Sequence, residues 1–185
     1  MVLSRRLLRV AALGAVIALA LAGTALAETY TWKEGVTSGA WNNPSNWTAG
    51  SGYPGDGDTA IFTKSAEITA LENPSKVAEL KFTGNATLTL NDSNDGRFLK
   101  VRKLTVADGK QVTIDSRSKI SISLGSNSPI EVGSDATLTI EYGGVFSGAG
   151  ELQLSGGGTL DLKISIDDVK LNRSEERRVG KECRS

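Results

Sequence analysis

A doublet of short segments in which apolar and polar residues alternate recurs four times along the chain. The copies begin at Leu80, Leu104, Ile130 and Leu152, so the steps between them are 24, 26 and 22 residues. In each copy two apolar residues flank one polar residue, and the same pattern returns eight residues later. The four doublets are Leu80, Phe82, Leu88 and Leu90; Leu104, Val106, Val112 and Ile114; Ile130, Val132, Leu138 and Ile140; and Leu152, Leu154, Leu160 and Leu162. Internal repeats with this period are typical of solenoids.

Each doublet predicts a strand, a turn and a second strand, because alternation with period two puts the apolar residues on one face. A glycine lies in every gap, at Gly84, Gly109, Gly133 and 156–158, and glycine permits the positive φ of a sharp corner. Two such strands cannot bury a face alone, but a chain that lies on its own previous turn pairs them in parallel at ~4.8 Å.

The sequence therefore predicts an all-β fold, a parallel β-helix of about four coils, in which the first residues of the doublets stack on one another. A third strand in each coil is expected at 98–101, 120–124 and 164–166. The alternative is a β-sandwich, whose strands also recur every ~8–12 residues, but the near-constant period favours the β-helix.

The two ends of the chain have a different character. Three arginines precede an apolar run at 10–22, and Ala25-Leu26-Ala27 offers the small residues of a signal peptidase site. We therefore expect residues 1–27 to be a signal peptide, which exports the chain. Residues 173–185 resemble a translated sequencing adapter, and we interpret them as an artefact rather than as a basic, disordered tail.

Residues 28–172 then contain 13 basic and 18 acidic residues. This acidic balance disfavours nucleic acid and anionic membranes as partners. The one cysteine, Cys183, lies in the artefactual tail, so neither a disulfide framework nor a cysteine zinc site is expected. The apolar run of the signal is too short for a convincing membrane span, and none is expected in the mature fragment.

Residues 28–72 are rich in aromatic residues and turn formers. We expect bulky rings just before the first repeat to cover the open end of the β-helix as an N-terminal cap, ahead of coils at 73–172. The alternative is a glycan-binding platform, because aromatic faces also stack on sugar rings. Its candidate residues are Trp32, Trp41, Trp47 and Tyr53.

Two motifs resemble a known family. Gly39-Ala40-Trp41, Asn46-Trp47, Pro54 and 58–62 resemble the start of bacterial autotransporter-type passenger proteins, and 146–152 with 156–162 resembles their passenger-associated β-strand repeat. The resemblance implies an N-terminal fragment of a protein with a tryptophan-rich opening followed by β-coils. It also implies that the exported chain reaches the bacterial cell surface, outer membrane or extracellular space. The C-terminal translocator barrel of that family has no counterpart in this sequence.

Residues suited to catalysis are sparse. The chain has no histidine, so the usual serine or cysteine triads and histidine metal sites are excluded. Asp115, Glu141 and Lys163 follow their doublets at one register, and we expect a row of solvated charges there rather than a catalytic group. Asp56 and Asp58 with Asn46, and the segment 92–96, contain calcium-type ligands, but turn formation is the preferred interpretation.

The sequence thus favours a structural, adhesive stub that acts by lateral binding, without catalysis, metal or cofactor, and with surface glycans or neighbouring cells as partners. A truncated polysaccharide lyase or glycosidase on the same fold, and a glycan-binding cap module, are the alternatives. The last doublet should present an unpaired strand edge, so edge-to-edge self-association of the truncated chain is also expected.

Overall fold

The computed structural model describes residues 26–48, 52–72, 75–92, 97–116, 121–124, 128–141, 151–163 and 170–173. Within these ranges the chain forms strands and one short 3-10 helix, η1 (Pro44–Asn46). The strands are β1 (Thr29–Thr31), β2 (Ser38–Ala40), β3 (Thr59–Phe62), β4 (Ala66–Ala70), β5 (Ser75–Phe82), β6 (Ala86–Leu90), β7 (Phe98–Val106), β8 (Gln111–Ser116), β9 (Ser121–Leu124), β10 (Pro129–Val132), β11 (Thr137–Glu141), β12 (Glu151–Ser155), β13 (Thr159–Lys163) and β14 (Lys170–Arg173).

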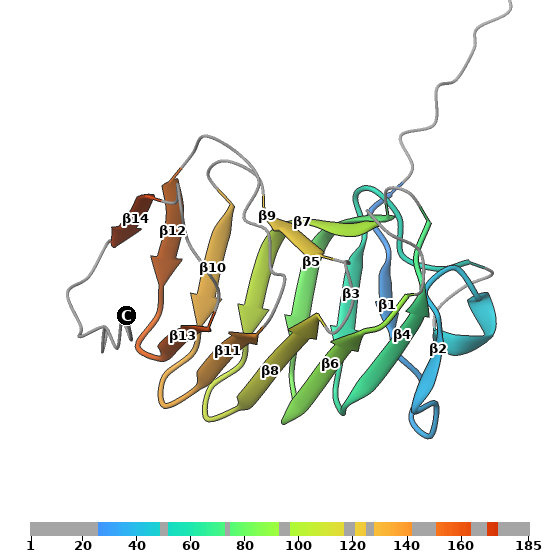
Figure 1. Ribbon diagram of the computed structural model, residues 1–185, viewed down its shortest axis with the longest axis horizontal. Helices are drawn as coiled ribbons and strands as arrows, with labels where there is room; N and C mark the ends of the chain where they lie inside the picture. Colours follow the sequence, from blue (N-terminus) through green and yellow to red (C-terminus); the bar gives the residue numbers. More distant parts are fainter. Residues whose placement is uncertain are drawn as a thin grey trace, which may run out of the picture.

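These strands form two parallel sheets. The first has the order β1-β3-β5-β7-β10-β12-β14, with β9 also paired to β7, and the second has the order β13-β11-β8-β6-β4-β2. The chain alternates between the sheets, and its turns follow one another along the long axis of the molecule (Figure 1). The predicted all-β parallel β-helix is confirmed. The four doublets become the strand pairs β5/β6, β7/β8, β10/β11 and β12/β13.

The register of the first sheet agrees with the predicted stacking except in the last doublet. Leu80 lies beside Leu104, and Leu104 beside Ile130. The next residue of this column is Leu154, not Leu152 as predicted. Because side chains alternate along a strand, a shift of two residues keeps the same face buried.

The second sheet shows the same kind of shift at its first doublet. Ala86 lies beside Val112 and Leu88 beside Ile114, so the copy begins two residues earlier than the doublet pattern predicts. Leu90 pairs with Ser116 instead. From Val112 onward the prediction is correct, because Val112 pairs with Leu138, and Leu138 with Leu160.

Both shifts follow from shorter corners, which contain Gly84 and Gly156. The corner glycines only partly do what the sequence predicts. Gly156 has a φ of 94° and Gly109 one of 65°, as expected for sharp corners. At Gly84 the requirement is close approach to the previous coil, because an added Cβ would lie 1.9 Å from the carbonyl oxygen of Thr63. Tight packing of one corner on the next therefore sets the chain length between strands.

Of the segments predicted as third strands, 98–101 and 121–124 are described, and both are in strands. The first part of β7 pairs with β9, so that Leu99 lies beside Ile122 and Val101 beside Leu124. The segment 98–101 is not a separate strand, because it continues directly into the rest of β7. Residue 120 and residues 164–166 of this prediction lie outside the described residues.

The core is one apolar column that extends from the N-terminal segment into the repeats. Leu80, Leu104 and Ile130 are fully buried, whereas Leu160 and Leu162 in β13 are only partly buried. Strands β1 to β4, which come from residues 28–72, belong to the same two sheets as the repeats. The aromatic segment is therefore continuous with the solenoid.

Candidate binding surfaces

The aromatic residues of the N-terminal segment form one buried cluster. Trp41, Trp47 and Trp32 expose 1%, 2% and 4% of their surface. The ring centroids of Trp47 lie 4.9 Å from those of Trp41 and 5.0 Å from those of Trp32, both edge to face. Phe62 stacks on Trp32 and on Phe82, at 5.8 Å in each case, so the cluster joins the first coil to the core column.

The indole N–H groups of the cluster are all used inside the protein. Trp41 Nε1 donates to the carbonyl oxygen of Pro54 at 3.0 Å, and Trp47 Nε1 to that of Trp41 at 2.8 Å. Trp32 Nε1 donates to the carbonyl oxygen of Val36 at 2.6 Å. Tyr53, the fourth predicted glycan-binding residue, is partly buried against the core, and its hydroxyl donates to Glu72 at 3.0 Å, which raises the pKa of Tyr53.

A short antiparallel crossing covers the outer edge of β1. Lys33 N donates to the carbonyl oxygen of Asn46 at 2.8 Å, Thr48 N donates to that of Thr31 at 2.9 Å, and Trp32 and Trp47 form the antiparallel bridge between them. An antiparallel segment uses the backbone groups to which another parallel coil would bind. The geometry favours the capping interpretation, and the three buried indoles offer no open face to a sugar ring.

The three candidate calcium ligands bind separate partners. Asp58 accepts the backbone N–H groups of Glu28 at 2.9 Å and Gly55 at 2.8 Å, as a turn residue does. Asp56 forms an ion pair with Arg102, and the Asn46 side chain donates to a backbone carbonyl. Among the described residues, no group of three or more acidic, histidine or cysteine side chains is placed to hold a metal ion.

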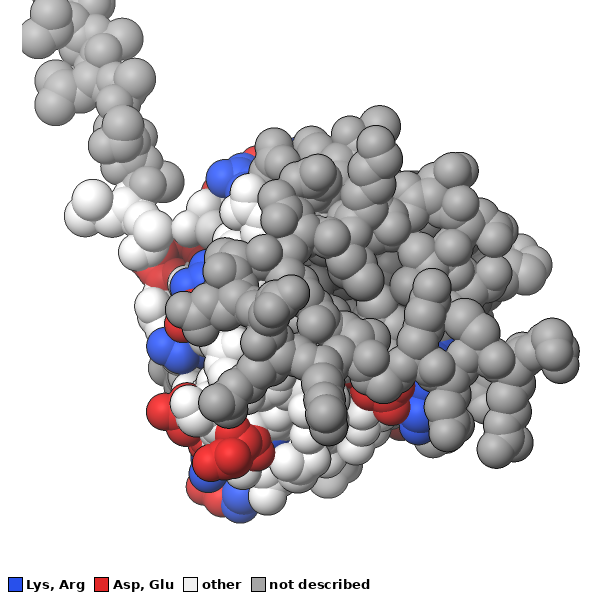
Figure 2. Space-filling view, turned by 90° about the vertical axis from the view of Figure 1, so that its left-hand side faces the viewer, with Lys and Arg blue, Asp and Glu red and all other residues white. Residues whose placement is uncertain are grey.

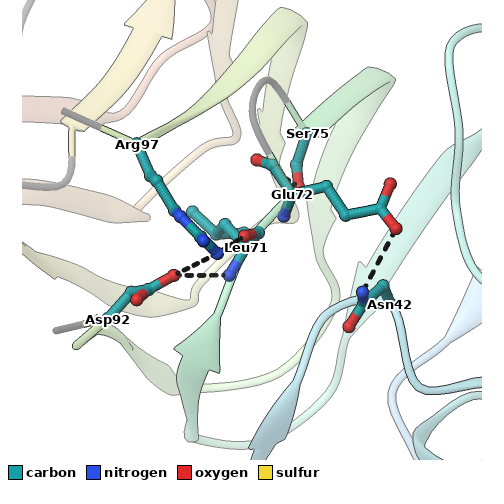
Figure 3. Close-up of polar contacts among 6 residues, drawn as sticks. All are labelled: Asn42, Leu71, Glu72, Ser75, Asp92 and Arg97. Atoms are coloured by element: carbon teal, nitrogen blue, oxygen red, sulfur yellow. Dashed lines mark hydrogen bonds and ion pairs between the residues drawn. The ribbon is translucent and has the colours of Figure 1, made fainter. Parts of the chain in front are cut away.

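Asp92, the first residue of the other candidate calcium segment, is a buried structural anchor. Its carboxylate accepts the backbone N–H of Leu71 at 2.8 Å and lies 3.2 Å from a guanidinium nitrogen of Arg97 (Figure 3). The same guanidinium nitrogen donates to the carbonyl oxygen of Leu71. These contacts tie the corner after β6 to the corner after β4. Residues 93–96 of that segment lie outside the described residues.

The predicted row of Asp115, Glu141 and Lys163 exists at the register expected. Asp115 in β8 lies beside Glu141 in β11, which lies beside Lys163 in β13. Lys163 Nζ is 2.7 Å from Glu141 Oε1. Asp115 is only 7% exposed, so the row is not fully solvated as the sequence suggested. Seen from the C-terminal end, described acidic and basic side chains lie close together (Figure 2).

A second charged row, which the sequence interpretation missed, lies on the outer face of the first sheet. Lys103 Nζ sits 3.0 Å from Glu131 and 3.5 Å from Glu79. Its hydrogen bond to Glu131, together with both negative charges, raises the pKa of Lys103. Thr105 also donates to Glu79, at 2.7 Å. Only the strand register brings these residues together, since they are far apart in the sequence.

Beside the earlier part of β7, a small hollow of about 70 Å³ is lined by Asp56, Lys76, Val77, Lys100 and Arg102. Lys76 in β5 and Lys100 in β7 are directly in register. Arg102 lies two residues beyond Lys100, so it projects from the same face. Sequence reasoning missed this basic cluster too, although Lys76 and Lys100 each precede a buried valine.

A larger hollow, of about 300 Å³, lies beside the cap between residues 32–37 and 63–65. Lys64 and Glu34 form an ion pair at its rim, and this pairing lowers the pKa of Glu34. Trp32, on its inner wall, is 4% exposed. The hollow therefore has little aromatic surface to offer a ligand.

Within the described ranges, no helix is both long and apolar enough to cross a membrane. Among the residues that the structure describes, charged side chains form rows on two outer sheet faces and line one basic hollow. Comparison of the chain with protein-family models, curated proteins and solved structures finds no match.

Proposed function

We propose that this chain is the N-terminal, adhesive part of an exported bacterial surface or secreted protein of the autotransporter passenger type. It acts by lateral contacts of its solenoid faces rather than by catalysis. The signal-like segment 1–27 and the two motifs at 39–62 and 146–162 support export and the family. Surface glycans or neighbouring cells are the proposed partners.

The single observation that carries this proposal is the in-register stacking of polar and charged side chains on the outside of the two sheets. Each strand of a parallel stack repeats its outward residues at ~4.8 Å from the next. Rows such as Glu79, Lys103 and Glu131 therefore form a regular, extended surface. A surface of this kind suits many weak contacts whose strength grows with the number engaged at once.

Adhesion can be tested with beads that carry the purified protein at increasing density. We expect attachment to glycan-coated surfaces and to cells to rise more steeply than in proportion to density, because multivalent contacts act together. Beads coated with the thermally unfolded protein are the matched control. No attachment at any density would contradict the proposed function.

Export is a separate part of the proposal and has its own test. The full chain produced in a bacterium should be found outside the inner membrane with Glu28 as its first residue, which mass spectrometry of the intact protein measures. Replacing Ala27 with Arg removes a small residue of the predicted cleavage site and should leave the precursor uncleaved. Recovery of the uncleaved chain in the cytoplasm would contradict export.

A second candidate, a polysaccharide-active enzyme, is favoured by one observation, the neighbouring carboxylates of Asp115 and Glu141 with Lys163 on the next strand. Acid–base cleavage of a glycan uses two carboxyl groups. The ion pair between Glu141 and Lys163 favours a structural role instead. Release of new sugar ends from a polysaccharide by the protein, abolished in Glu141→Gln, would replace the adhesive proposal with the enzymatic one.

A further inference from the structure

We propose that Lys76, Lys100 and Arg102 form a binding site for one acidic group of a glycan, a carboxylate or a sulfate ester carried on a sugar. The inference rests on the proposed function and deepens it, because it names the class of glycan that the solenoid face contacts.

The first argument is the position of the two lysines. Lys76 and Lys100 lie directly beside each other on β5 and β7, and both side chains are exposed. Strand neighbours in a sheet are ~4.8 Å apart, and like charges in directly opposite positions destabilise a sheet. An anion placed between the two ammonium groups would relieve this repulsion.

The second argument is the contrast with the two other cations of β7. Lys103 lies between Glu79 and Glu131, and Arg102 pairs with Asp56. Within the part of the chain that the structure describes, Lys76 and Lys100 make no ion pair. The ammonium groups of these two lysines are therefore available to an external anion.

The third argument is the shape of the site. The two lysines line a hollow of about 70 Å³ together with Arg102, whose ion pair with Asp56 holds the guanidinium at the rim. The three cations exceed the single carboxylate by two charges. The hollow is large enough for one carboxylate or sulfate group but not for a sugar ring, so the ring would rest on the surrounding sheet face.

The site also fits the charge of the whole chain. Residues 28–172 carry 13 basic and 18 acidic residues, so a long polyanion would meet repulsion over most of the surface. Exposed charges are largely screened beyond ~8 Å at physiological salt. A single acidic group in the hollow would therefore interact mainly with the local excess of positive charge.

The test uses protein expressed from the full chain, with tetragalacturonate and its fully methyl-esterified form as a matched ligand pair. We expect calorimetric titration to detect binding of the acid and not of the neutral ester, and added salt to weaken it. A sulfated oligosaccharide should compete for the same site. Sodium sulfate and sodium acetate, the free anions, should bind at least about tenfold more weakly because they lack the contacts of the sugar, about 1.4 kcal/mol.

The variant Lys76→Gln/Lys100→Gln should lower the affinity for tetragalacturonate by about tenfold or more. The control Lys81→Gln/Lys110→Gln removes the same charge elsewhere and should change the affinity less than about twofold. Circular dichroism and thermal melting verify folding, and loss of the lysine repulsion should leave the melting temperature unchanged or higher.

Several results would overturn the site. They are equal binding of the acid and its ester, equal affinity for free sulfate and for the acidic oligosaccharide, unchanged affinity in the Lys76/Lys100 variant, or an equal loss in the control. Beads that adhere to neutral and acidic glycans alike would overturn this site and leave the adhesive function standing. Beads that adhere to nothing would overturn the adhesive function itself.

Discussion

Replacing Leu104 with alanine should strongly destabilise the solenoid. Leu104 is fully buried in β7, with Leu80 on one side of its column and Ile130 on the other. Loss of a buried leucine side chain costs about 2–5 kcal/mol, with the larger values where the surroundings cannot collapse into the space. Backbone hydrogen bonds hold both neighbouring strands in place, so we expect about 3–4 kcal/mol.

Leu154 provides the matched control, because it lies in the same column two strands further on but is only partly buried. Leu154→Ala should cost about 1 kcal/mol, since less apolar surface returns to water. Urea unfolding followed by circular dichroism measures both values. With a slope of about 2 kcal/mol per molar urea, the midpoints should fall by about 1.5–2 M and about 0.5 M.

The three tryptophans add a second probe, because all of them lie in the cap. Tryptophan fluorescence reports unfolding of the cap, and circular dichroism reports the sheets as a whole. In a solenoid each coil contacts only its neighbours, so unfolding is not required to be all-or-none. Separate transitions for the two probes in Leu104→Ala would show that the cap keeps its fold when the middle of the stack opens.

The reasoning fails if Leu104→Ala costs less than about 1 kcal/mol or no more than Leu154→Ala. A double-mutant cycle tests the register directly. Truncations of Ile130 and Leu154, which are neighbours in the column, should show a coupling of about 0.5 kcal/mol or more. Truncations of Leu80 and Leu154, which are not neighbours, should be additive.

Three further changes test other parts of the fold. Gly84→Ala should destabilise the protein by at least about 2 kcal/mol, because its Cβ would lie 1.9 Å from the carbonyl oxygen of Thr63; an unchanged urea midpoint would refute the close approach. The Tyr30 hydroxyl donates to Glu28 at 2.6 Å, which raises the pKa of Tyr30 to about 12. The stability from this bond should be complete below pH 10.0 and be lost as the pH rises towards 12, which urea unfolding at each pH measures. Tyr30→Phe should lose less stability over this range, and an equal loss in the variant would refute the contribution of Tyr30. Finally, β13 ends its sheet in the described residues, and Leu162 in β13 is partly exposed. Sedimentation should therefore reveal concentration-dependent association, which Leu162→Lys should reduce. A monomer at every concentration would count against an open edge.

The sequence predicts the fold well, because the repeat and the alternation of apolar and polar residues both indicate which side chains are buried in the core. A parallel stack requires apolar residues on one face at a constant interval, and the doublets show both. The exact register is harder to predict, because shifting a strand by two residues leaves the same face inside. Leu152 and Leu154 are therefore equivalent in the pattern, and only the short corner at Gly156 distinguishes them.

For the cap, the sequence pattern fits two different interpretations. A tryptophan-rich segment is compatible with a packed end and with a sugar platform, since both use large aromatic faces. The two interpretations differ in whether the ring faces are covered and the indole N–H groups are hydrogen-bonded inside the protein, as they are for Trp41 and Trp47. The antiparallel crossing of Asn46–Thr48 over β1 is made of backbone hydrogen bonds, and no residue type in the sequence encodes it plainly.

The core register also explains why the basic hollow was missed. Packing of Val77 on Val101 fixes the alignment of β5 and β7, and the same alignment necessarily sets Lys76 against Lys100 one position earlier. A slip of one residue would separate the lysines only by moving the valines out of the core, because it reverses every side chain. Lys103, in contrast, has the carboxylates of Glu79 and Glu131 on its two neighbouring strands. A like-charge pair that the core imposes, and that forms no ion pair with the described residues, is a local inconsistency of the kind that marks binding sites in otherwise consistent folds.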